Sequence, residues 1–114
     1  MINFACRKIK LEELIRCSLG LSRSDYKLFD FLLNKEGNHT IKDLSEELSL
    51  DRTTIQKSMK KLLEAQVVKQ LQENLSPGGY RFVYKIKDKK AIKNMMFSII
   101  DKWNGNVRNV IKSW

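Results

Sequence analysis

Residues that bind metals or build disulfide frameworks are nearly absent from this sequence of 114 residues. Its two cysteines, Cys6 and Cys17, are too few for a disulfide scaffold and form no CxxC motif. If residues 6–17 were helical, about three turns would separate the sulfurs by roughly 16 Å, which excludes an intrachain bond. The single histidine, His39, cannot form a zinc site alone. We therefore expect buried free thiols and no cofactor, with an interchain disulfide as an alternative.

Long apolar runs are missing as well. No stretch of about eighteen apolar residues occurs, so no membrane-spanning helix is expected. The N-terminal segment MINFACRKIK places its basic residues after a very short apolar patch, which does not fit a secretory signal. Apolar residues still make up 42% of the chain, enough for one folded domain. These features predict a folded cytoplasmic protein with no membrane partner.

Motifs of enzymes are also lacking. The sequence contains no P-loop and no dinucleotide-binding fingerprint, and SPGGY is an isolated turn, not a phosphate cradle. The Ser, His and Cys side chains show no recognisable catalytic order. We predict that the protein is not an enzyme.

Acidic residues are scarce in the second half of the chain. Residues 1–50 contain eight basic and eight acidic residues, whereas residues 51–114 contain fourteen basic and five acidic ones. The whole net charge of +9 therefore arises after Leu50. This asymmetry predicts a polyanionic partner, with nucleic acid favoured over an anionic membrane surface.

Apolar spacing and capping residues predict a series of short helices. The first covers about residues 8–18. The second begins after Ser22, where Asp25 completes a capping box, and the third begins after Thr40. Only two residues separate the third helix from Asp51, the cap of the fourth. Two short helices joined by so tight a turn predict a helix-turn-helix motif.

The segment DRTTIQKSMKKLLEAQVV, residues 51–68, has one apolar face and one basic face rich in hydroxyls. Such side chains bond base edges and phosphates in a DNA major groove, where carboxylates are repelled. The candidate base-reading residues in its first two turns are Arg52, Thr53, Gln56 and Lys57. The candidate contacts to the DNA backbone are Thr54, Lys60 and Lys61. Thr54 could instead bond back to the Asp51 cap, and a merely solvated basic face is the alternative for the whole helix.

A β-hairpin is predicted next. Residues 67–73 and 80–86 alternate as strands do, and NLSPGG between them contains the only proline and two adjacent glycines. A helix-turn-helix followed by such a hairpin is a winged helix. Gly78, Gly79 and Arg81 are the candidate wing contacts to DNA phosphates or the minor groove. Because the tip has no positive charge, an ordinary hairpin turn is the alternative.

Asp88 caps a final helix with a long apolar stripe, which the weak helix formers at residues 104–106 are expected to kink. The stripe has nearly heptad spacing and is too long for a small core to bury. Either it packs over the first helices of its own chain, or it pairs with a second copy, which we favour. The candidate dimerisation residues are Ile92, Met96, Ile99, Trp103, Val107, Val110 and Trp114.

The predicted fold class is therefore α+β and mainly helical, a winged helix-turn-helix with a two-stranded wing and a long C-terminal helix. Residues 1–87 form the DNA-binding domain in this prediction. Residues 88–114 form a dimerisation helix that belongs to the same compact unit.

The segments LGLSRSDYKLFDFLL, TIKDLSEELSLDRTTIQKSMKKLLEAQVVKQ and PGGYRFVYKI resemble the winged-helix domain of the MarR and TrmB-like transcriptional regulators, and in particular small archaeal members. The resemblance covers residues 20–86 in pattern. It implies a homodimer that binds operator DNA and usually represses transcription. By this resemblance, Arg52, Thr53, Gln56 and Lys57 match the base-reading stretch of the family, and Arg81 lies in the wing.

Two features depart from this family. Members often have Gly where this chain has Gln66, so Gln66 must adopt a left-handed conformation or end its helix differently. TrmB proteins carry a large sugar-binding domain after the winged helix, and we expect no such domain within these 114 residues. MarR proteins bind small phenolic ligands instead, and no residue here identifies such an effector.

These observations favour a sequence-specific transcriptional regulator, most simply a repressor, that binds double-stranded DNA as a homodimer. Residues 52–65 would lie in the major groove, and the wing at residues 74–79 on the backbone or in the minor groove. Two alternatives stay open: a winged-helix protein-interaction module of a transcription or processing assembly, and a non-specific architectural nucleic-acid binder.

Overall fold

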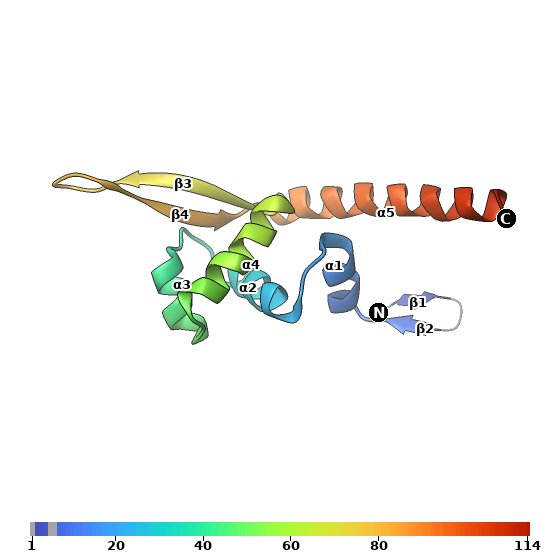
Figure 1. Cartoon of the computed structure of the whole chain (residues 1–114), viewed down its shortest axis with the longest axis horizontal. Helices are drawn as coiled ribbons and strands as arrows, with labels where there is room; N and C mark the ends of the chain where they lie inside the picture. Colours follow the sequence, from blue (N-terminus) through green and yellow to red (C-terminus); the bar gives the residue numbers. More distant parts are fainter. Residues whose placement is uncertain (1, 5–6) are drawn as a thin grey trace. The chain divides into compact units, whose positions relative to one another are not determined.

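The structure, a computed structural model, describes residues 2–4 and 7–114, which divide into two compact units (Figure 1). Unit 1 contains the two ends of the chain, up to Leu19 and from Asp88 onward, and unit 2 contains Gly20–Lys87. The N-terminal residues thus group with the C-terminal helix, whereas the division expected from the sequence placed them with the winged helix.

Unit 2 is a winged helix, as the sequence predicted. Its elements, in chain order, are α2 (Arg23–Asn34), α3 (Ile41–Leu48), α4 (Arg52–Glu64), β3 (Val68–Asn74) and β4 (Tyr80–Ile86). The two strands pair antiparallel in a register that runs from Val68↔Ile86 to Asn74↔Tyr80. Residues 75–79 therefore form the tip of the wing.

Predicted capping residues start the helices of unit 2. The Ser22 hydroxyl accepts a hydrogen bond from the Asp25 N–H at 3.2 Å, and the Asp25 carboxylate accepts one from the Ser22 N–H at 2.9 Å. This reciprocal pair is the expected capping box of α2. The Thr40 hydroxyl accepts from the Asp43 N–H at 3.1 Å and caps α3.

The core of unit 2 lies between its three helices and the base of the hairpin. Its fully buried side chains are Leu28, Phe29, Leu32, Leu44, Ile55, Met59, Leu62 and Val67. Three of them come from α4, so the apolar face of this helix is fixed inward and its polar face outward. His39 is buried beside this core, with backbone pairing to Tyr84 and its Nε2 3.0 Å from the Lys35 carbonyl oxygen.

The turn after α4 contains Gln66 in a left-handed conformation, with φ of +61°. The left-handed conformation costs a residue with a Cβ about 1–2 kcal/mol, whereas glycine adopts it without this cost. We expect Gln66→Gly to raise the free energy of unfolding by about 1 kcal/mol, because the greater freedom of an unfolded glycine offsets part of the gain. Urea unfolding measures the change. Gln66→Ala is the matched control, since alanine is strained in the same way, and a gain from alanine as large as that from glycine would contradict the explanation.

Unit 1 contains a short hairpin and two helices. Strand β1 (Ile2–Phe4) pairs antiparallel with β2 (Arg7–Ile9), and α1 (Leu11–Leu19) contacts α5 (Lys89–Lys112). The prediction of a helix over residues 8–18 is wrong at its start. Residues 7–9 are extended because they pair with β1, and the helical hydrogen bonds begin at the Lys10 carbonyl, which accepts from the Leu14 N–H at 3.1 Å.

This strand also removes the basis of the predicted distance between the two cysteines. That distance assumed a helix from residue 6, but Arg7–Ile9 form β2. Cys6 lies outside the described residues. Cys17 is a free thiol on α1, and it is exposed, not buried as expected.

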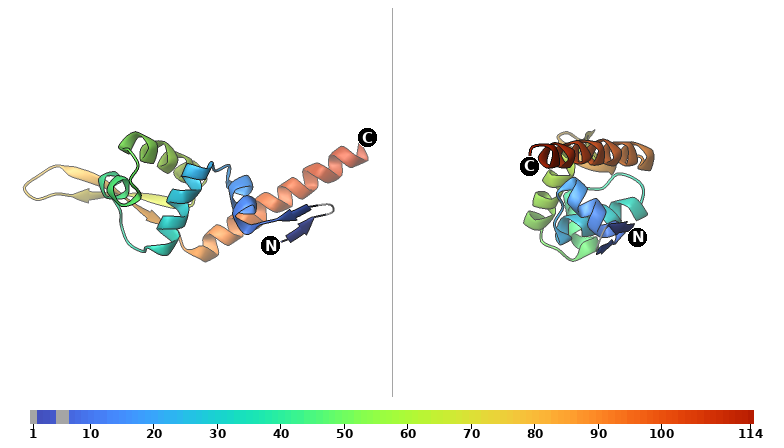
Figure 2. Two further views of the ribbon diagram at one scale, coloured as in Figure 1. Left: turned by 90° about the horizontal axis from the view of Figure 1, so that it is seen from below. Right: turned by 90° about the vertical axis from the view of Figure 1, so that its right-hand side faces the viewer.

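Helix α5 begins where predicted, because the Asp88 carboxylate accepts a hydrogen bond from the Ala91 N–H at 2.6 Å. The expected interruption at residues 104–106 is wrong, since the helix continues unbroken to Lys112 (Figure 2). Gly105 costs a helix only about 1 kcal/mol relative to alanine, which the cooperative hydrogen bonding on both sides can absorb. None of the helices in the described chain is long and apolar enough to cross a membrane.

Candidate nucleic-acid interface

Helix α4 separates its side chains into a buried set and an exposed set. The buried residues are Ile55, Ser58, Met59 and Leu62. The exposed residues that the sequence singled out are Arg52, Thr53, Gln56, Lys57, Lys60 and Lys61. Thr54 is half-buried at the edge between the two sets. The structure therefore brings all predicted base-reading residues together on the outer face of one helix.

The N-terminus of α4 is fixed by Asp51. Its carboxylate accepts a hydrogen bond from the Thr54 N–H at 3.3 Å. The Thr54 side chain beside it is the main cause that holds the pKa of Asp51 below its ordinary value of 3.8, and the Thr54 N–H and the nearby Lys57 charge add to it. A lowered pKa means that the cap is fully formed above about pH 4 and weakens as the pH falls further. Thr54 therefore bonds to the cap through its backbone N–H.

Among the described residues, no ion pair joins a cation of α4 to a carboxylate. The ion pairs found between described residues are Arg7–Glu13, Lys35–Glu47 and Arg81–Glu73. None of these includes a cation of α4, whose only acidic residue is Glu64 in the last turn. The positive charge on the outer face of α4 is therefore available to attract a polyanion.

The wing differs from α4 in its electrostatics. The Arg81 guanidinium lies beside Glu73, with Nη2 and Nε at 2.6 and 3.0 Å from the same carboxylate oxygen. Gly78 and Gly79 at the tip both have positive φ, which explains why glycine occupies these positions. The expected wing residues are thus together, but the charge of Arg81 is balanced within the wing.

One face of the wing is aromatic, a feature that the sequence analysis did not treat as functional. Tyr80 and Phe82 are exposed, and their ring centroids lie 5.5 Å apart in an edge-to-face arrangement. The strand alternation had placed both on one face, but it did not show whether a core would cover them.

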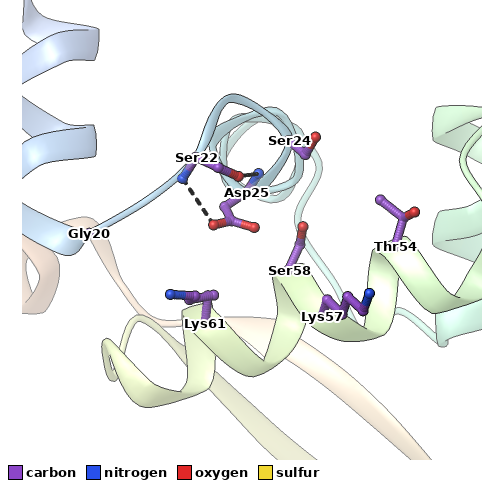
Figure 3. A pocket seen from close by; sticks show the side chains of 8 residues that line it. All are labelled: Gly20, Ser22, Ser24, Asp25, Thr54, Lys57, Ser58 and Lys61. Atoms are coloured by element: carbon purple, nitrogen blue, oxygen red, sulfur yellow. Dashed lines mark hydrogen bonds between the residues drawn. The ribbon is translucent and has the colours of Figure 1, made fainter.

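A pocket of about 350 Å³ lies beside the outer face of α4 (Figure 3). Its wall from the start of α2 consists of Gly20, Ser22, Ser24 and Asp25. Its wall from α4 consists of Thr54, Lys57, Ser58 and Lys61. This pocket could not be predicted from the sequence because it joins residues about thirty positions apart, although the sequence shows the capping box at Ser22 and the spacing of the two lysines separately.

The candidate dimerisation residues lie in unit 1 and change from buried to exposed along α5. Ile92 is buried, whereas Met96, Ile99 and Val107 are half-buried. The other three are exposed: Trp103 is 54% and Val110 is 68% exposed, and Trp114 is fully exposed. Large apolar side chains gathered on one exposed helix face are typical of an interaction surface.

Comparison with known proteins gives consistent matches over most of the chain. A family model described as "Sugar-specific transcriptional regulator TrmB" matches residues 15–90. A solved structure described as a possible transcriptional regulator from Methanosarcina mazei Go1 has a TM-score of 0.91 and 36% sequence identity, covering 100% of this chain and 96% of that chain. The uncharacterized protein MJ1503 of Methanocaldococcus jannaschii is 28% identical over 98% of this chain and 84% of its own length. MJ1082 of the same organism is 30% identical over 90% of this chain and 83% of its own length.

Proposed function

Since the chain belongs to the TrmB family of transcriptional regulators, we propose that it binds double-stranded DNA sequence-specifically, as a homodimer, to regulate transcription. The observation that carries this proposal is the outer face of α4, where exposed cations, hydroxyls and an amide lie together and the cations form no ion pair with a described residue. Repression is the simplest output, because a bound dimer would occlude a promoter. The proposed activity is binding without catalysis, and the proposed location is the cytoplasm.

In the proposed complex, α4 lies in the major groove. Arg52 and Gln56 suit bidentate bonds to guanine and adenine, and Thr53 and Lys57 lie within the same two turns. The proposed backbone contacts of α4 are Thr54, Lys60 and Lys61. Thr54 is the least available of them, because it is half-buried whereas Lys60 and Lys61 are exposed.

The wing at residues 74–79 is proposed to lie along the DNA backbone or in the minor groove, through Gly78, Gly79 and Arg81. Arg81 can reach a phosphate only if it shares or leaves its ion pair with Glu73. The wing should therefore add less to the salt dependence of binding than α4 does.

Homodimerisation is proposed to pair the α5 stripe of one copy with that of a second copy. This pairing would cover Trp103, Val110 and Trp114, which the single chain leaves exposed. A two-fold dimer would present two α4 helices to half-sites about one DNA turn apart.

Selection of bound duplexes from a random DNA library, at about physiological salt and with the purified protein, tests the proposal. We expect recovery of a short inverted repeat with half-sites about ten base pairs apart. Salt-sensitive binding without any recovered motif would instead indicate an architectural nucleic-acid binder. No retained DNA would mean that the winged helix is a protein-interaction module.

A further inference from the structure

The pocket between α2 and α4 combines cationic and hydroxyl groups beside the proposed DNA-reading face. Lys57 and Lys61 lie one helical turn apart on α4, with Ser58 between them (Figure 3). Ser24 closes the opposite wall from the first turn of α2. Lysine ammonium and serine hydroxyl groups are common donors to phosphate oxygens. The lining therefore has the composition of an anion site.

Ser58 contributes a largely buried hydroxyl to the lining of this pocket. Its side chain is 3% exposed and points from α4 into the pocket, toward Asp25 (Figure 3). Within residues 2–4 and 7–114, no protein group forms a hydrogen bond with this hydroxyl, and its oxygen is not sealed in the core. Because this hydroxyl faces the pocket without a protein partner, it can bond to a group that enters the pocket.

The first turn of α2 supplies further donors. The Asp25 N–H already donates to the Ser22 hydroxyl at 3.2 Å. The N–H groups of Arg23 and Ser24 have no acceptor within the helix, as is usual for the first turn. They lie at the positive end of the helix dipole, which favours a negative ligand.

The net charge of the pocket lining indicates which kind of anion fits. The lining contains the two lysines and one carboxylate, that of Asp25, which is 6% exposed and accepts the Ser22 N–H at 2.9 Å. The positive surplus is therefore about one charge, increased by the helix dipole. A singly charged phosphodiester matches this surplus, whereas a doubly charged phosphate monoester would be opposed by Asp25. Each internucleotide phosphate of DNA carries one negative charge.

We propose that this pocket binds one phosphodiester group of the DNA backbone, so that α2 and α4 hold the same phosphate. This inference rests on the DNA-binding function proposed above and adds α2 to the interface. A contact of this kind fixes the depth and register of α4 in the groove without reading the sequence. It therefore strengthens binding to operator and to random duplex by the same factor.

Ser24→Glu tests the site. A carboxylate at this exposed second position of α2 is favourable for the helix, so the fold is retained, but the charge occupies the place of the phosphate. We expect binding to the selected duplex and to random duplex to weaken equally, by about 10- to 100-fold. The plot of the logarithm of the binding constant against the logarithm of the salt concentration should become less steep, by about the slope that one phosphate contact contributes. Fluorescence anisotropy at several salt concentrations measures both.

Asn38→Glu is the matched control. It adds the same charge to an exposed residue of the same unit, but beyond the opposite end of α2. Because roughly 16 Å of helix separates the two ends, salt screens this charge from the pocket, and binding should change by about 2-fold or less. Ser58→Ala removes only the buried hydroxyl and should weaken binding of both duplexes by about 3- to 10-fold.

The results separate this inference from the proposed function. If the wild-type protein binds its selected duplex and Ser24→Glu behaves as Asn38→Glu does, the pocket assignment is overturned while DNA binding stands. If the wild-type protein binds no duplex, amide shifts of Arg23 and Ser24 are followed during titration with dimethyl phosphate and with inorganic phosphate. A stronger response to inorganic phosphate would assign the pocket to a free phosphorylated compound, and no saturable response to either would overturn the site altogether.

Discussion

Replacement of both Arg52 and Gln56 by alanine is expected to remove most of the preference for operator over random duplex. Each good bidentate contact with a base provides about 1–3 kcal/mol of discrimination, so the specificity ratio should fall by about 10²- to 10³-fold. Affinity for random duplex should fall by less than about 10-fold, because only one positive charge is lost. Competition between the selected duplex and a shuffled duplex of equal length, at constant salt, measures the ratio.

The two substitutions are not expected to unfold the protein. Both side chains are exposed, Asp51 still caps the helix, and alanine is a strong helix former. Lys60→Ala is the matched control on the same face, since the loss of a phosphate contact should weaken both duplexes alike and reduce the salt slope by about one. An unchanged ratio in the double variant would show that α4 reads bases through other residues.

The features of α4 that make this experiment possible could be predicted from the sequence because they are local. A cap at Asp51 and apolar residues at Ile55, Met59 and Leu62 determine where the helix starts and which face is buried. The strands of the wing could also be predicted, since segments with alternating side chains stand on both sides of a proline-glycine turn. The second strand covers Tyr80–Ile86 as predicted.

Features that depend on contacts between distant residues could not be predicted in the same way. The strand Arg7–Ile9 exists through its pairing with Ile2–Phe4, and three residues contain too little alternation to reveal this. The ion pair of Arg81 with Glu73 follows from the hairpin register, which places these residues opposite each other. The pocket needed the packing of α2 on α4, which no pattern within either helix contains.

Trp103→Ala is expected to convert the proposed homodimer into monomers. Trp103 is 54% exposed in the single chain and occupies the middle of the α5 stripe. Loss of a tryptophan from the centre of an interface typically costs about 2–4 kcal/mol, and the variant dimer loses one from each copy, so the dimer dissociation constant should rise by at least about 30- to 10³-fold. Sedimentation velocity over a range of concentrations measures this shift. Affinity for the full inverted repeat should fall with it, while affinity for one half-site should remain, because linkage of two α4 helices, and not α4 itself, is lost.

Phe97→Ala is the matched control for Trp103→Ala. Phe97 is another large aromatic residue of α5 and is also exposed, but helical geometry places it about 120° from the centre of the stripe. Its removal should leave both the dimer and the binding of the inverted repeat unchanged. A Trp103→Ala protein that stays dimeric but unfolds at lower temperature would instead assign Trp103 to the core of its own chain. Dissociation caused by Phe97→Ala alone would move the interface to the opposite face of α5, and the two half-sites would then be held by a different pairing of the same helix.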